Sequence, residues 1–89
     1  MFTDDESPLE FPCEFPIKAM GRGDEDFALH VVGLIRPHAP DMDSSRVRTT
    51  PSRHGRYVSV TVTITAENRA QLDAIYRSLH ADERVVMTL

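Results

Sequence analysis

The segment from Tyr57 to Ile64, YVSVTVTI, constrains the fold of this chain more than any other part of the sequence. Valine or isoleucine occupies every second position, and tyrosine, serine or threonine occupies the positions between. Because successive side chains of a β-strand point to opposite faces, one face of this strand is apolar and the other is polar. The pattern is typical of an antiparallel sheet that helices cover on one side only.

Two other segments have the apolar spacing that is typical of amphipathic helices. The first follows Asp24, which we expect to cap it, and its last turn should kink or stop at Pro37, because proline has no N–H to donate to the carbonyl of Gly33. The second runs over residues 66–80, with Thr65 as the expected N-cap. Each helix therefore presents one apolar face to the rest of the chain.

Shorter alternating segments predict further strands at residues 15–20, 46–50 and 84–89, and Gly21 and Pro51 are expected to end the first two. In the last strand we expect the odd-numbered residues to face the helices and the even-numbered ones to face away: Val85, Met87 and Leu89 against Arg84, Val86 and Thr88. The element order is then strand, helix, strand, strand, helix, strand. Right-handed crossovers place the first and third strands in the centre. The sequence therefore predicts an α+β fold, a two-layer ferredoxin-like βαββαβ sandwich with a four-stranded antiparallel sheet and two helices on one face.

The amino-terminal residues differ in composition from the rest of the chain. Residues 1–9 are polar, acidic and interrupted by proline, which predicts a flexible acidic tail ahead of a single domain over residues 10–89. The sole cysteine excludes an internal disulfide. No apolar stretch approaches about 18 residues and no secretory leader is evident, so we expect a cytoplasmic protein.

Basic residues gather in one acid-free part of the chain, although the formal net charge is −4 and argues against a general polyanion binder. They lie in and around the hairpin expected between the second and third strands: Arg46, Arg48, Arg53, His54 and Arg56. Alternation adds further polar side chains on the bare sheet face: Lys18, Ser59, Thr61 and Thr63. We expect these residues to bind a partner protein or a second copy of the chain. The alternative is a solvated turn whose charges discourage pairing between sheet edges.

Weak nucleic-acid contact through the basic hairpin is a further hypothesis. RNA-recognition sheets of this topology stack bases on aromatic residues of the central strands. Lys18, Ser59 and Thr61 occupy such positions here, so the stacking rings are missing.

Catalytic motifs such as G-x-S-x-G and the P-loop are absent from the sequence. The four histidines and the cysteine lack the spacing of metal ligands. We therefore expect no enzyme activity, metal or cofactor.

Four pieces of the sequence occur in an order that resembles a known family: LEFPCEFPIKAMG, HAP, SRHGRYVSVTVTI and RVVMTL, between Leu9 and Leu89. Together they resemble the YbeD-like family of small bacterial proteins. The resemblance implies the fold of ACT regulatory domains, which sense amino acids, and it implies no established activity. A regulatory binding domain is the function that we expect from it.

The turn after the first strand is the alternative ligand site that this resemblance suggests. ACT domains usually carry an Asp-x-x-Gly-like turn there, whereas this chain has MGRGDED. Glycines that lead into a helix N-terminus can bind an anion through backbone N–H groups. A small-molecule sensor would use the residues of this turn: Gly21, Arg22, Gly23 and Asp24.

Overall fold

A computed structural model describes residues 9–23, 26–51 and 55–89. It contains four strands, two α-helices and two short 3-10 helices, in the order β1 (Cys13–Arg22), α1 (Asp26–Ile35), η1 (Arg36–His38), η2 (Ser44–Arg46), β2 (Val47–Pro51), β3 (Tyr57–Ala66), α2 (Arg69–His80) and β4 (Val85–Thr88). The predicted α+β class and βαββαβ order are confirmed.

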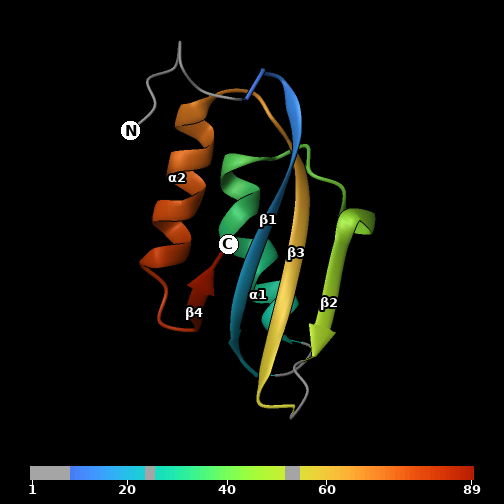
Figure 1. The fold of residues 1–89 in the computed structure, drawn as a ribbon, viewed down its shortest axis with the longest axis vertical. Coiled ribbons are helices and arrows are strands. Elements are labelled where there is room, and N and C mark those ends of the chain that lie inside the picture. Colours follow the sequence, from blue (N-terminus) through green and yellow to red (C-terminus); the bar gives the residue numbers. More distant parts are fainter. Residues whose placement is uncertain (1–8, 24–25, 52–54) are drawn as a thin grey trace.

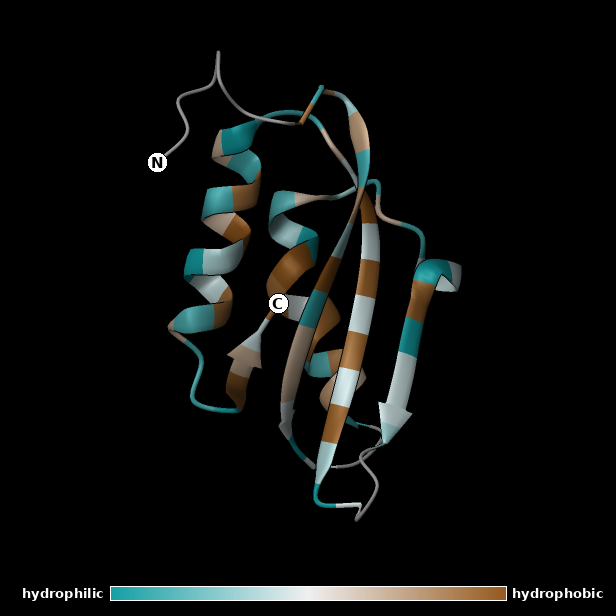
Figure 2. Cartoon of the chain, viewed as in Figure 1, coloured by the Kyte–Doolittle hydropathy of each residue, from teal (hydrophilic) through white to brown (hydrophobic). Residues whose placement is uncertain are grey.

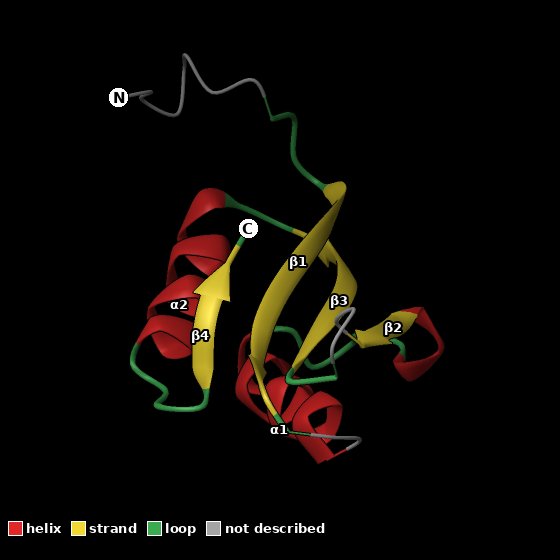
Figure 3. Cartoon of the chain, turned by 60° about the horizontal axis from the view of Figure 1, so that its bottom comes forward, coloured by secondary structure: helices red, strands yellow, loops and turns green. Residues whose placement is uncertain are grey.

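The strands form one antiparallel sheet in the order β2-β3-β1-β4, with β1 and β3 in the centre as predicted (Figure 3). The long central pair aligns ten residues of each strand, from Cys13 opposite Ala66 to Arg22 opposite Tyr57. This register matters for function because it fixes which side chains of neighbouring strands stand side by side.

Both helices pack on the same side of the sheet and enclose the core (Figure 1). The alternation of β3 is visible in Figure 2, and all five of its inward residues are buried. Ala39 and Met42, between η1 and η2, are also part of the core. The other core residues come from β1, both helices and β3: Ile17, Ala19, Phe27, Val31, Ile35, Val58, Val60, Val62, Ile64, Ala66, Leu72, Ile75 and Leu79. In the described part of the chain no helix packs on the other face of the sheet (Figure 1), as the period-two pattern predicts.

Gly21 lies within β1, because the strand stays paired with β3 through Arg22. The expectation that Gly21 ends the strand is therefore wrong. A Cβ atom at this position would meet the ring of Phe27 and the backbone carbonyl of Arg84. The glycine thus allows the first buried side chain of α1 to pack directly against the strand.

The helix ends agree only in part with the sequence. α1 ends at Ile35 and the chain continues as η1, which contains Pro37, so the predicted stop is confirmed. The predicted cap Asp24 lies outside the described residues. α2 begins at Arg69, where the side chain of Asn68 accepts a hydrogen bond from the Gln71 N–H at 2.8 Å. Among the described residues, neither α-helix is long and apolar enough to span a membrane.

The assignment of Thr65 as the N-cap of α2 is wrong, because β3 extends through Ala66. Ala66 is fully buried and continues the inward series of the strand. Thr65 is consequently an exposed strand residue on the opposite face.

The predicted orientation of β4 is also wrong for three residues. Met87 pairs with Met20 on the bare face and Thr88 with Ala19 on the helix side, because a bulge shifts the register next to Gly21. Thr88 Oγ1 accordingly lies 2.8 Å from His80 Nε2 of α2. Met87 and Leu89 are 53% and 69% exposed instead of buried.

Candidate functional site

The bare face of the sheet has a row of three polar side chains across its middle. Arg48 of β2 and Lys18 of β1 both stand opposite Thr61 of β3, on either side of it. Directly opposed side chains in an antiparallel pair have Cβ atoms about 4.5 to 5.5 Å apart. The small hydroxyl of Thr61 is therefore flanked by two cations on neighbouring strands.

A third cation and one carboxylate lie further along the bare face. Arg46 Nη2 lies 2.8 Å from Glu14 Oε2, an ion pair that joins the residue before β2 to β1. Between them runs β3, where Thr63 stands opposite Pro16 and Thr65 opposite Glu14. The two side chains therefore meet over the polar face of β3.

An open hollow of about 480 Å³ lies on the bare face between η2 and the strands. Its lining consists of two guanidinium groups, three hydroxyl groups and one proline ring: Arg46, Arg48, Ser45, Thr61, Thr63 and Pro16. Every polar side chain in this lining can donate a hydrogen bond. A negatively charged oxygen is the group that such a lining suits best.

The far end of the bare face is less open to a ligand ring. The guanidinium of Arg22 lies 5.7 Å from the centroid of the Tyr57 ring, in cation–π geometry. In the row next to Arg22 and Tyr57, Ser59 of β3 stands between Met20 of β1 and Thr50 of β2. The aromatic ring at the edge of the face is thus already in contact with a side chain of the protein.

Charges are distributed unevenly over the molecule. The described strands and η2 bring four cations to the bare face and one carboxylate: Lys18, Arg22, Arg46 and Arg48 against Glu14. Within the described part of the chain, Lys18 and Arg48 have no acidic partner within 4.0 Å. Since the whole chain has a net charge of −4, the bare face is a basic surface on an acidic protein.

The basic hairpin is described only in part. Gly55 has φ +70°, the left-handed conformation expected for a hairpin turn, and Arg56 beside it is exposed. Arg53 and His54 lie outside the described residues. The bare-face residues and Arg56 therefore remain the described part of the predicted partner-binding set.

The side chain of Arg84 lies beside the described part of the turn between β1 and α1. The Arg84 guanidinium donates to both carboxylate oxygens of Asp26, at 3.0 and 3.1 Å, and lies 5.5 Å from the Phe27 ring centroid. A Cβ atom at Gly23, which has φ +132°, would lie 2.9 Å from Arg84 Nη2. Packing accounts for Gly21 near the end of β1 and for Gly23 in the turn. A small-molecule role for Gly21, Arg22, Gly23 and Asp24 stays a prediction.

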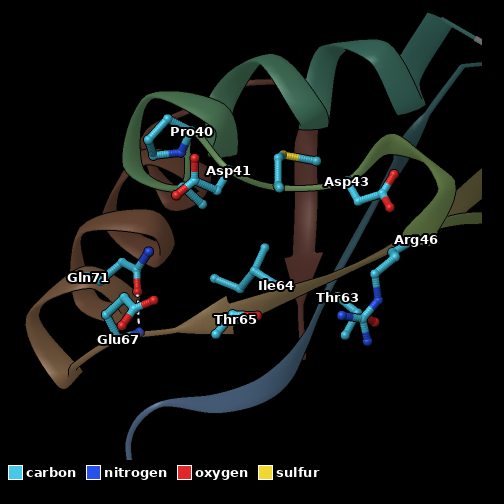
Figure 4. A pocket seen from close by; sticks show the side chains of 11 residues that line it. Pro40, Asp41, Asp43, Arg46, Thr63, Ile64, Thr65, Glu67 and Gln71 are labelled. Carbon is cyan, nitrogen blue, oxygen red and sulfur yellow. Dashed lines mark hydrogen bonds between the residues drawn. The ribbon is translucent and has the colours of Figure 1, made fainter.

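A second hollow, of about 330 Å³, lies between the last residues of β3 and the segment that joins η1 to η2 (Figure 4). Arg46 and Thr63 line one side of it, and Glu67 and Gln71 line the other. The Glu67 N–H donates to Gln71 Oε1 at 2.7 Å, so these residues join the end of β3 to the start of α2. No group of three potential metal ligands occurs among the residues that the structure describes.

The pKa shifts of the described groups have local structural causes. The Ser45 backbone N–H, 2.9 Å from Asp43 Oδ1, holds the pKa of that carboxyl below its usual range. Burial raises the pKa of the Tyr76 hydroxyl, which donates to the Leu89 carbonyl at 3.1 Å. Burial would also raise the pKa of Asp82, but hydrogen bonds from His30 and the Arg84 N–H outweigh it and lower that pKa. None of the three groups belongs to the sheet face.

Sequence reasoning singles out neither Glu14 nor Ser45. Glu14 has the same parity as Lys18, so extending the predicted strand of residues 15–20 by one position would place it on the bare face. Its pairing with Arg46 depends on the strand order, because the two residues are far apart in the chain. The ion pair is therefore a tertiary feature without a local sequence signal.

Comparison with known proteins identifies relatives that extend over nearly the whole chain. Residues 6–89 match the family described as proteins of unknown function, DUF493. A UPF0250 protein of Azotobacter vinelandii is 52% identical over 89 residues, which cover 98% of this chain and 97% of the relative. The UPF0250 protein NE1487 of Nitrosomonas europaea is 42% identical over 85 residues, 96% of this chain and 98% of the relative.

One solved structure has the same fold. The solution structure of HP0495 from H. pylori superimposes with a TM-score of 0.72, covering 100% of this chain and 94% of that one. At 16% sequence identity the likeness concerns the fold alone. Together with the sequence matches, which confirm the YbeD-like resemblance, these findings show that the chain belongs to the DUF493 family of UPF0250 proteins.

Proposed function

We propose that this protein is a non-catalytic regulatory domain that binds an acidic segment of a partner protein on the bare face of its sheet. The observation that carries the proposal is the charge of that face, with four cations and one carboxylate on a chain of net charge −4. Such a charge distribution steers acidic partners toward one side of the molecule and repels them from the rest.

The chemistry of the face favours carboxylates over aromatic or apolar ligands. Arg48 and Lys18 flank Thr61, and the hollow beside them adds Arg46, Ser45 and Thr63 as further hydrogen-bond donors. Nucleic acid is a weaker candidate, because the central strands offer no free ring for stacking and Tyr57 is in contact with Arg22.

The spacing of the cations suits an extended chain. Arg46 and Arg48 are two residues apart along the chain, and Lys18 and Arg22 are four apart on β1. In an extended segment, alternate side chains point the same way about every 6.8 Å. A partner segment with acidic residues at alternate positions would bring successive carboxylates over successive rows of the sheet.

The proposal is tested with a fluorescein-labelled peptide of alternating glutamate and serine, whose binding is measured by fluorescence anisotropy. A peptide of alternating glutamine and serine is the uncharged control. We expect the glutamate peptide alone to bind, and its affinity to fall as salt is raised from about 0.05 M to about 0.5 M, because salt screens exposed charges.

Charge reversal separates the sheet face from the overall charge. Lys18→Glu with Arg48→Glu should abolish binding, whereas Arg36→Glu with Arg77→Glu should weaken it only slightly. Both double variants shift the net charge equally, and all four side chains are exposed, so folding should be preserved. Equal losses in the two double variants would refute a specific role for the bare face.

A further inference from the structure

The ion pair between Glu14 and Arg46 shows how a carboxylate sits on the bare face. Glu14 Oε2 lies 2.8 Å from Arg46 Nη2, at the border of the hollow that Arg46 and Arg48 line. This carboxylate belongs to the chain itself. It therefore occupies the Arg46 guanidinium, which an acidic partner could otherwise bind.

The pair is exposed and correspondingly weak. The side chain of Glu14 is 69% exposed and that of Arg46 is 35% exposed. Exposed ion pairs contribute little to stability, because water solvates the separated charges well and ordering two long side chains costs entropy. An incoming carboxylate can thus replace Glu14 without disturbing the fold.

A carboxylate from a partner could contact more hydrogen-bond donors in the hollow than the Glu14 carboxylate does. Glu14 contacts Arg46, whereas Arg48 has no acidic partner within 4.0 Å in the described part of the chain. Ser45, Thr61 and Thr63 line the space between the two guanidinium groups and add hydroxyl donors. A carboxylate that reaches this space from outside could contact both arginines and these hydroxyls.

We propose that Glu14 is an intramolecular competitor, which holds Arg46 until a glutamate or aspartate side chain of the partner displaces it and binds between Arg46 and Arg48. This inference rests on the proposed function and assigns one position of the partner's acidic segment. It also gives the face a threshold, because a partner must offer more than one carboxylate to outcompete a tethered one.

The test measures the affinity of the fluorescein-labelled glutamate–serine peptide for the full chain, three single variants and one double variant. Glu14→Gln keeps the length of the side chain but removes its charge, and should bind the peptide about two- to five-fold more tightly, the factor expected for loss of a competing exposed ion pair. Glu10→Gln is the matched control, since Glu10 is also exposed and precedes β1. It should change the affinity less than Glu14→Gln does, although it alters the net charge equally.

Arg46→Met identifies the guanidinium that Glu14 blocks. The variant should bind the peptide more weakly, and adding Glu14→Gln to it should no longer raise the affinity. Far-UV circular dichroism of each variant establishes that the fold is intact. An equal gain in Glu14→Gln and Glu10→Gln, or the same gain with and without Arg46, would overturn the competitor role.

The outcomes distinguish this inference from the proposed function. If Glu14→Gln leaves the affinity unchanged while reversal of Lys18 and Arg48 abolishes binding, the competitor role is refuted and the basic face stands. If neither Lys18, Arg48 nor Glu14 affects the affinity, both proposals are refuted. Two small anions, inorganic phosphate and the dicarboxylate glutarate, are then compared as competitors of the peptide. If phosphate displaced the peptide at a lower concentration than glutarate does, a preference for carboxylates would be contradicted.

Discussion

Alanine substitution at two glycines should have opposite effects on the stability of this domain. Gly21 lies in β1 under the first buried ring of α1, whereas Gly33 lies on the exposed side of α1. The same added methyl group therefore meets a packed interior at one position and open space at the other. The pair tests the packing of α1 on the sheet with one chemical change.

The structure sets the expected magnitudes. A Cβ atom at Gly21 would meet the Phe27 ring and the Arg84 carbonyl, neither of which is the free end of a flexible side chain. Overpacking of this kind costs about 1 to 3 kcal/mol. At Gly33 no atom lies within 4 Å of the added Cβ, and alanine in a helix is more stable than glycine by about 0.5 to 1 kcal/mol. The two variants should therefore differ by about 1.5 to 4 kcal/mol, a large part of the stability of a small domain.

Urea unfolding followed by far-UV circular dichroism measures the difference. We expect a lower midpoint for Gly21→Ala and a higher midpoint for Gly33→Ala, with similar slopes in all three proteins. If Gly21→Ala were neutral or stabilising, the close contact of Phe27 with β1 would be wrong. If Gly33→Ala were destabilising, the placement of Gly33 on the exposed side of α1 would be wrong.

Three further changes test other parts of the fold. Val60→Asp places a charge in the core and should unfold a domain that is stable by only about 5 to 15 kcal/mol, whereas Thr61→Asp on the bare face should be tolerated; equal damage in thermal unfolding would contradict a sheet covered on one side. Asn68→Ala should cost about 1 kcal/mol in urea unfolding and Asn68→Ser less than half of that, because serine also caps helices; equal losses would refute the cap of α2. Asp82 has a lowered pKa in the folded protein, so its contribution to stability is present above about pH 4, where the unfolded carboxyl is also ionised, and is lost as pH falls through the lower folded pKa. The stability gap between the wild-type protein and Asp82→Asn should accordingly narrow on acidification, and a gap that widens below about pH 4 would contradict this sign.

The covered face follows from the period-two pattern of β3, which is long enough to be unambiguous. The central position of β1 and β3 follows from the order of the elements and the right-handed crossovers between them. Alternation fails in β4 because a bulge next to Gly21 moves Met87 to the bare face, and a bulge leaves no mark in a strand of four residues. The N-cap of α2 was misplaced for a related reason. Thr65 is a good cap by residue type, but burial of Ala66 keeps the chain in β3 beyond it.

The alternation of side chains along each strand predicts which residues of the candidate site share a face, but not which of them are in contact. Parity alone places Lys18, Thr61 and Arg48 on one face, and the register then brings them into one row. The ion pair of Glu14 with Arg46 requires the order of three strands and the path of η2, which no local pattern contains. Long-range contacts of this kind are decided by packing of the whole sheet, so residue types near them carry little signal.

Backbone amide chemical shifts, measured during titration with the glutamate–serine peptide, test the central claim most directly. The basic-face account predicts that the largest shifts occur in the middle rows of the sheet, around Lys18, Arg48 and Thr61, and that salt reverses them. The α2 amides around Ile75, on the other side of the core, should shift little. Shifts that instead centre on α2 or around Gly23, in the turn after β1, would contradict the account and favour a different binding surface.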